Sequence, residues 1–120
     1  MAKILVIGGS GFLGSHVADL LTANGHDVYI YDIIKSKYLI SSQKMIIGDV
    51  LDKKLIDRSI SNVEYVYHFA AIADIKEAKD DPIKSANFNI IGTLNILDAC
   101  KKYNVRRIIF SSSIYVYSNH

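Results

Sequence analysis

Gly8-Gly9-Ser10-Gly11-Phe12-Leu13-Gly14 is the stretch of sequence that decides the fold, and it directly follows the apolar run Ile4–Ile7. Four of the chain's seven glycines fall within it. A strand that ends in such a turn and continues into a helix presents unpaired N–H groups and the positive end of a dipole, which attract phosphate. Glycine also leaves room for a diphosphate to approach the main chain. The stretch therefore has the pattern of a dinucleotide-binding loop.

The glycines of this loop fit two different spacings. Gly9, Gly11 and Gly14 give G-x-G-x-x-G, the spacing of the common dinucleotide-binding fold. Gly8, Gly11 and Gly14 give G-x-x-G-x-x-G, the spacing that resembles short-chain dehydrogenase/reductase proteins. Both share Gly11 and Gly14, so the loop alone leaves the two spacings open.

The composition is that of one compact domain. The 120 residues are half apolar, and their acids and bases are interspersed with a net charge of +2, which gives no case for nucleic acid or an anionic membrane. No apolar run is long enough to span a bilayer, and no cleavable signal pattern follows Met1. Cys100 is the only cysteine, so no internal disulfide forms. We therefore expect a cytoplasmic protein.

Strands and helices are predicted to alternate along the chain. Apolar runs indicate strands at residues 4–7, 28–31, 44–47, 64–69 and 106–110, and helical spacing follows the glycine loop and covers residues 53–60, 74–80 and 85–103. Leu13, Val17, Leu20 and Leu21 form a stripe expected to face the sheet. The alternation predicts an α/β fold with a doubly wound, Rossmann-like parallel sheet in the order 3-2-1-4-5.

Asp32 ends the second predicted strand, where the acidic residue of a dinucleotide-binding fingerprint belongs. A carboxylate there accepts hydrogen bonds from the adenosine ribose hydroxyls and repels a 2′-phosphate, so NAD is favoured over NADP. Lys35 and Lys37 follow closely and would soften the exclusion of NADP. The alternative is a solvated aspartate in a loop.

Two further strand ends carry candidate residues. Asp49 follows the third strand, where it would meet an adenine amino group, and Ala70-Ala71 are small enough for the backbone to pass close against a cofactor. His68 is better interpreted as a packing residue than as a base, because no carboxylate or nucleophile adjoins it in sequence.

Helix 85–103 carries apolar residues on two faces. Ile90, Leu94 and Leu97 lie on one face, and Ile96, Cys100 and Tyr103 lie on the other. One sheet does not cover a surface that wide, so we expect a second partner, either more of the chain or another subunit.

In order along the chain, these motifs resemble the N-terminal part of the extended short-chain dehydrogenases/reductases, in the NAD-dependent epimerase/dehydratase family. The motifs are Gly8-x-x-Gly11-x-x-Gly14, Asp32, Gly48-Asp49-Val50, His68-Phe69-Ala70-Ala71, Asp81-Pro82, Asn89-Ile90-Ile91-Gly92-Thr93, and Phe110-Ser111-Ser112-Ser113 followed by Val116-Tyr117. The ordered set covers essentially the whole chain and selects the Gly8 spacing. Ala73 stands where some epimerases have lysine, so epimerisation itself is not specifically indicated.

The resemblance implies a role for each matching residue. The implied cofactor-binding residues are Gly8, Gly11, Phe12, Leu13 and Gly14 at the diphosphate, Asp32 at the ribose, Asp49 and Val50 at the adenine, and Ala70, Ala71 and Asn89 along the cofactor wall. Ser113 matches the catalytic serine or threonine that hydrogen-bonds the substrate oxygen. The family also implies a nucleotide-sugar substrate, a homodimer and no metal.

The family's reaction also needs a tyrosine with a lysine four residues later, normally beyond the Val116-Tyr117 pair. The only such spacing here, Tyr31 and Lys35, spans a strand end and is rejected as a coincidence. Residues 1–120 are therefore predicted to be part of an NAD(P)-binding Rossmann domain, without the catalytic pair or the substrate-binding lobe, and inactive alone. The alternatives are a non-catalytic NAD(P)-sensing module and part of a ketone or steroid reductase of the same superfamily.

Overall fold

The five strands form one parallel sheet in the order β3-β2-β1-β4-β5, in a computed structural model that describes residues 1–117. The strands are β1 (Lys3–Ile7), β2 (Asp27–Asp32), β3 (Lys44–Ile47), β4 (Tyr65–His68) and β5 (Arg107–Phe110). The predicted doubly wound α/β class and strand order are confirmed. Each strand begins and ends within one residue of its predicted bounds.

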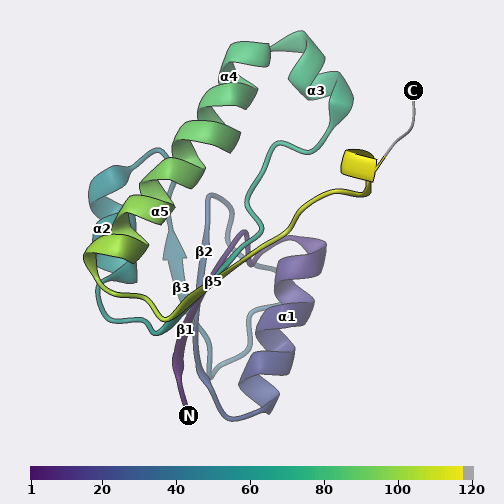
Figure 1. The fold of residues 1–120 in the computed structure, drawn as a ribbon. Helices are drawn as coiled ribbons and strands as arrows, with labels where there is room; N and C mark the ends of the chain where they lie inside the picture. Colours follow the sequence, from purple (N-terminus) through teal and green to yellow (C-terminus); the bar gives the residue numbers. More distant parts are fainter. Residues whose placement is uncertain (118–120) are drawn as a thin grey trace.

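Helices cover both faces of the sheet (Figure 1). Helix α1 (Phe12–Ala23) lies on one face, and α2 (Lys53–Ile60) and α5 (Gly92–Lys102) lie on the other. Helices α3 (Ile75–Asp80) and α4 (Pro82–Ala86) lie beyond the carboxyl ends of the strands. A π-helical turn, η1 (Asn87–Ile91), joins α4 to α5, and a 3-10 turn, η2 (Ile114–Tyr117), follows β5.

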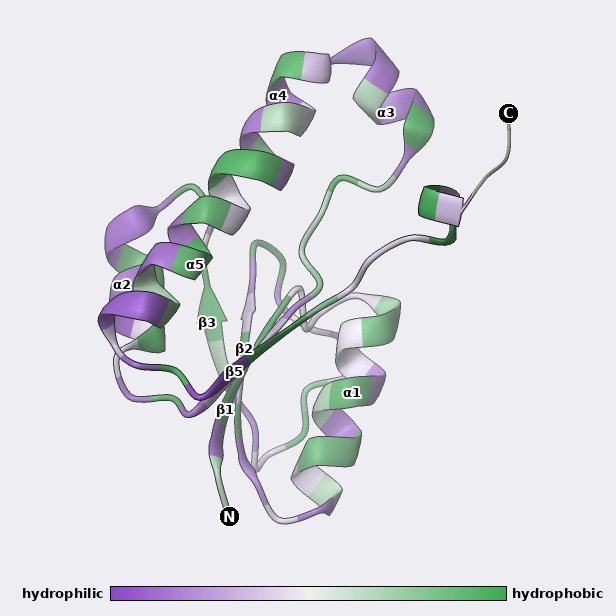
Figure 2. Ribbon diagram, viewed as in Figure 1, coloured by the Kyte–Doolittle hydropathy of each residue, from purple (hydrophilic) through white to green (hydrophobic). Residues whose placement is uncertain are grey.

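The core has two parts, one on each side of the central strand β1. Leu5 and Ile7 point into the larger part, against α2 and α5, while Val6 points into the smaller part, against α1. Figure 2 shows the apolar strands enclosed between these helices. A strand covered on both faces is apolar without alternation, which explains the run at residues 4–7.

The predicted apolar stripe of α1 is buried only in part, since Leu21 packs against the smaller part of the core and Val17 is half-buried. Leu13 and Leu20 are exposed, and the residues of α1 that are buried are Gly14, Ser15 and Ala18. The cause lies at the start of the helix, where a Cβ on Gly14 would stand 2.2 Å from the Gly8 carbonyl oxygen. A helix held so close to the loop has room only for small side chains on the part of its surface that faces the sheet.

The long helix predicted at residues 85–103 is correct in its faces but not in its continuity. It begins at Pro82, where the Asp81 carboxylate accepts from the Lys84 N–H at 3.0 Å, and the π-helical turn interrupts it. Ile90, Leu94 and Leu97 are between 43 and 59% exposed, which leaves that apolar face uncovered. No helix within residues 1–117 combines the length and apolarity needed to cross a membrane.

Candidate cofactor site

The glycine loop is shaped by contacts that exclude side chains. Gly8 has a φ of +81°, and a Cβ there would lie 2.7 Å from the Ala70 nitrogen. Gly11 is the N-cap of α1, and a Cβ there would make only an ordinary contact, 3.4 Å from the Gly8 carbonyl oxygen. No side chain caps this end of α1, and the first-turn N–H groups lack intrahelical acceptors. The loop therefore presents amides where an anion can approach.

Asp32 lies against the glycine loop. Its Oδ2 accepts from the Ser10 N–H at 3.0 Å, and its Oδ1 accepts from the Ile34 N–H at 3.2 Å. The Ser10 hydroxyl donates to the Ile34 carbonyl oxygen at 2.6 Å. The two halves of the predicted fingerprint, which are distant in sequence, thus meet at the carboxyl end of the sheet.

Asp49 and Val50 are fixed between β2 and α5. The Tyr31 hydroxyl donates to the Asp49 carbonyl oxygen at 2.7 Å, and the Asn95 amide donates to the Val50 carbonyl oxygen at 3.1 Å. Burial, with smaller effects from Asp52 and Asp49, raises the pKa of Tyr31 to about 12. A buried phenol with so high a pKa is unsuited to proton transfer, which supports rejecting Tyr31 and Lys35 as a catalytic pair.

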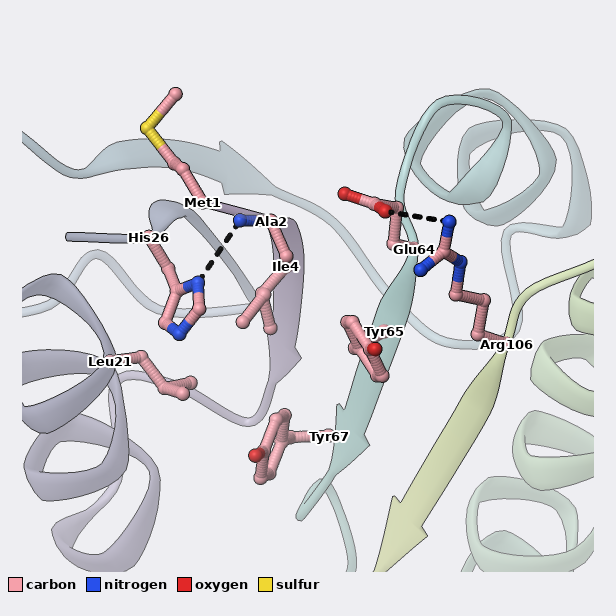
Figure 3. A pocket seen from close by; sticks show the side chains of 9 residues that line it. All are labelled: Met1, Ala2, Ile4, Leu21, His26, Glu64, Tyr65, Tyr67 and Arg106. Atoms are coloured by element: carbon pink, nitrogen blue, oxygen red, sulfur yellow. Dashed lines mark hydrogen bonds and ion pairs between the residues drawn. The ribbon is translucent and has the colours of Figure 1, made fainter. Parts of the chain in front are cut away.

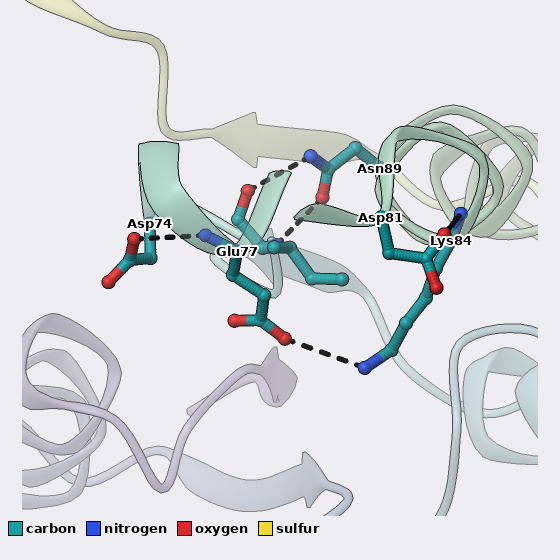
Figure 4. Close-up of polar contacts among 6 residues, drawn as sticks. Asp74, Glu77, Asp81, Lys84 and Asn89 are labelled. Carbon is teal, nitrogen blue, oxygen red and sulfur yellow. Dashed lines mark hydrogen bonds and ion pairs between the residues drawn. The ribbon is translucent and has the colours of Figure 1, made fainter. Parts of the chain in front are cut away.

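Asn89 braces the segment that contains Ala70 and Ala71 (Figure 4). Its side chain lies in the π-helical turn, accepts from the Ile72 N–H at 2.8 Å and donates to the Ile72 carbonyl oxygen at 3.1 Å. Ala70 packs against Gly8 on the other side. The segment after β4 is therefore held between the glycine loop and the π-helical turn.

Ser113 opens onto the same end of the sheet. It is exposed, and its hydroxyl oxygen accepts from the Tyr115 N–H at 3.2 Å. A cavity of about 530 Å³ is lined by the segments after β4 and β5, with Ala71 on one side and Ser113 on the other. The candidate catalytic hydroxyl and the candidate cofactor wall thus share one cavity. Pockets at the carboxyl ends of parallel strands are the usual ligand sites of this architecture.

A second cavity, of about 430 Å³, lies at the amino end of the strands (Figure 3). Three of its charged or imidazole side chains are already paired: His26 Nδ1 accepts from the Ala2 N–H at 3.1 Å, and the Arg106 guanidinium lies 3.6 Å from the Glu64 carboxylate. It has no helix amino terminus or glycine loop around it. Within residues 1–117, no group of three potential metal-ligating side chains occurs anywhere.

The predicted site residues lie at the carboxyl ends of the strands or in the segments that follow them, in the first turn of α1 and, for Asn89, in the π-helical turn. Sequence reasoning missed Ser10, whose amide and hydroxyl orient Asp32 and the loop after it. Its only signal was its place inside the glycine loop. The individual residue roles stay predictions.

Comparison with known proteins identifies the family. A model described as "NAD dependent epimerase/dehydratase family" matches residues 4–120. The chain belongs to that family. The family membership predicted from the ordered motifs is thereby confirmed, and the motifs span most of the matched region.

Members of the NAD-dependent epimerase/dehydratase family with known structure share this fold closely. The chain is similar to the UDP-glucose 4-epimerase of Thermotoga maritima, solved with UDP-glucose, with 38% identity, a TM-score of 0.88, and coverage of 92% of this chain and 38% of that one. It is also similar to the UDP-glucose 4-epimerase of Brucella ovis, solved with NAD, with 34% identity, a TM-score of 0.90, and coverage of 99 and 38%.

A relative with a different reaction is equally similar in sequence. The UDP-N-acetyl-alpha-D-glucosaminuronate decarboxylase of Bacillus cytotoxicus is 36% identical over 121 residues, which cover 96% of this chain and 37% of that protein. The chain spans between 36 and 39% of the length of the curated relatives it matches.

Proposed function

We propose that this chain is the NAD-binding portion of a nucleotide-sugar epimerase or dehydratase of the extended short-chain dehydrogenase/reductase type. The observation that carries the proposal is the contact between Asp32 and the glycine loop, 3.0 Å from the Ser10 N–H to Oδ2. It joins the phosphate-binding and ribose-binding halves of the fingerprint. Family membership and the NAD-bound epimerase of Brucella ovis support the choice of NAD.

The chain offers a fitting cradle for the diphosphate of NAD. Gly14 lets the start of α1 lie against Gly8, and Gly8 lets the loop lie against the backbone of Ala70, because a Cβ at either position would collide with backbone. Gly11 leaves the approach open, and the amides of Phe12, Leu13 and Gly14 stand at the positive end of the helix.

The remaining residues line the path of the rest of the cofactor. Asp32 would accept hydrogen bonds from the adenosine ribose, and Asp49 and Val50 would border the adenine. Ala70 and Ala71 would leave room for the cofactor on the wall that Asn89 braces through Ile72. Bound NAD supplies a carbon that accepts and returns hydride.

Ser113 is the residue proposed to act on the substrate. Its exposed hydroxyl would hydrogen-bond the substrate oxygen that gains and loses a proton. The acid/base tyrosine and its lysine have no counterpart in this sequence apart from the rejected Tyr31 and Lys35. We therefore propose that the chain alone binds NAD without turnover, which reduction of NAD on mixing with UDP-glucose would contradict.

The substrate is proposed to be a nucleotide sugar. Relatives of nearly equal similarity, an epimerase crystallised with UDP-glucose and a UDP-sugar decarboxylase, differ in reaction but share this substrate class. These residues therefore support the substrate class better than any one reaction. The exposed face of Ile90, Leu94 and Leu97 supports a homodimer of the whole protein, and a cytoplasmic location stays a prediction.

Calorimetric titration of the chain with NAD and with NADP tests the proposal. NAD should bind more tightly, and Asp32→Ala should reduce that preference, because the variant no longer repels a 2′-phosphate. Asp27→Ala is the matched control. Asp27 lies at the start of β2, the strand that Asp32 ends, and its carboxylate pairs with Lys44 away from the proposed site. Equal affinity of the wild type for NAD and NADP would contradict the role of Asp32, and undetectable binding of NAD would contradict the proposed function.

A further inference from the structure

His68, the last residue of β4, is a buried polar residue that the proposed function does not use. Its side chain is 1% exposed and shares a face of the sheet with Val66, toward α5. The ring Nε2 lies 2.9 Å from the Thr93 hydroxyl oxygen, and the ring centroid lies 5.6 Å from that of Phe110. The ring thus joins β4 to the helix that follows the π-helical turn.

The Thr93 hydroxyl fixes the direction of this hydrogen bond. It donates its single proton to the Asn89 carbonyl oxygen at 2.6 Å, so it can only accept from the imidazole. The proton of neutral His68 therefore sits on Nε2. Nδ1 is left without a partner among the described side chains and backbone groups.

Asn89 takes part with both its backbone and its side chain. Its carbonyl oxygen accepts from the Thr93 hydroxyl, and its side chain holds the segment after β4. The amide makes two hydrogen bonds to Ile72, as Figure 4 shows. Asn89 lies in the π-helical turn, where the Gly92 N–H reaches back to the Asn87 carbonyl oxygen. Such turns place a side chain where a regular α-helix would not, and they are frequent at functional sites.

We propose that His68 is a positioning residue of the cofactor site. It acts through Thr93 on Asn89, and so sets the position of Ile72 and of the segment after β4 against which the cofactor would lie. The proposal rests on the proposed function, because the wall matters only if NAD lies against it. Burial lowers the pKa of His68 to about 4, so the ring stays neutral and keeps its donating Nε2–H at neutral pH. A leucine or phenylalanine would fill the same space without leaving a buried acceptor unpaired, so packing alone gives no reason for a histidine.

Four single variants of the chain, with the double variant of His68→Leu and Thr93→Val, separate positioning from packing. His68→Leu and Thr93→Val each remove one end of the hydrogen bond, while His68→Gln keeps a donor near the position of Nε2. Val66→Ala is the matched control, because Val66 is buried on the same strand and face but makes no bond in this network. Each is titrated with NAD by calorimetry, and the Ile72 amide resonance is recorded by NMR without cofactor.

His68→Leu and Thr93→Val should each weaken NAD binding about tenfold, the lower end of the loss that follows when the partner orienting a metal ligand is removed. The double variant should be no weaker than either single variant, because both break one network. His68→Leu and Thr93→Val should shift the Ile72 amide resonance. His68→Gln and Val66→Ala should keep the wild-type resonance and the wild-type affinity for NAD.

The outcomes are distinguishable. Wild-type affinity for NAD in Thr93→Val, with an unshifted Ile72 resonance, would overturn the positioning role. Equal loss of affinity in Val66→Ala would overturn it as well, since general destabilisation would then account for the effect. Shifted Ile72 resonances in His68→Leu and Thr93→Val, together with a wild-type chain that binds no NAD, would support the network and contradict the proposed function instead.

Discussion

Acidification should destabilise this protein through the buried ring of His68. Burial lowers the pKa of this imidazole from 6.5 to about 4. In the unfolded chain the ring is in water, where its pKa is about 6.5. The unfolded state therefore takes up a proton that the folded state excludes. The pKa of His68 is lower in the folded state than in the unfolded state. The contribution of His68 to the free energy of unfolding is therefore fully present above about pH 6.5 and is lost as the pH falls toward 4.

The size of this loss follows from the two pKa values. Relative to about pH 7.5, the free energy of unfolding should fall by about 2 kcal/mol at pH 5 and about 3 kcal/mol at pH 4 from this ring alone. A loss of that size is a large fraction of the total stability of a typical domain.

Urea unfolding of the wild type and His68→Gln, followed by circular dichroism at about pH 7.5 and pH 5, measures this contribution. Carboxylates titrate in both proteins and cancel in the difference, so the wild type should lose about 2 kcal/mol more than the variant. Thr93→Val is the control that keeps the buried ring and should keep the wild-type dependence. The same pH dependence in wild type and His68→Gln, to within about 0.5 kcal/mol, would refute the reasoning.

Four other perturbations probe separate parts of the chain. Gly14→Ala should lower the free energy of unfolding by about 1–3 kcal/mol, because its Cβ would meet the Gly8 carbonyl oxygen at 2.2 Å. Gly11→Ala should lower it by less than about 1 kcal/mol but should weaken NAD binding. Urea unfolding measures the effect on stability, and calorimetry measures the effect on binding. Asp52→Ala should cost about 1 kcal/mol in urea unfolding, because the Asp52 side chain accepts from the Leu55 N–H at the start of α2. Burial raises the pKa of Cys100 to about 11, so iodoacetamide at pH 8 should alkylate the native thiol about two orders of magnitude more slowly than in urea, as mass spectrometry would record.

Most of the fold was predictable because local signals and global packing agree. Helices α1 and α5 end just before residues that turn the chain, Gly25 with a φ of +85° and Asn104 with a φ of 53°. Asp52 caps α2, as an aspartate directly before a helix is expected to do. The segment at residues 33–42 offered no such signal. It is anchored by long-range contacts, since Gln43 donates to Asp19 and Thr22 of α1.

The site was predictable as a set of positions but not as a network. Asp32 and the glycine loop were expected at one end of the sheet, and the structure brings them into contact. The hydrogen bond between His68 and Thr93 was not expected, because the two residues lie 25 positions apart and the bond depends on a π-helical turn. Helical periodicity assumes a constant turn, so it fails where the turn widens.

The exposure of Leu13 and Leu20, half of the stripe predicted for α1, shows why the loop matters beyond its amides. Hydrophobic periodicity locates the buried face of a helix when side chains set the distance to the sheet. In α1 that distance is set by backbone contact between Gly14 and Gly8, so small residues face inward and larger ones are displaced. Phe12 and Leu13 are left 84 and 50% exposed at the end of α1 where the diphosphate is proposed to bind. The glycines thus present the start of the helix to a ligand as well as leaving room for one.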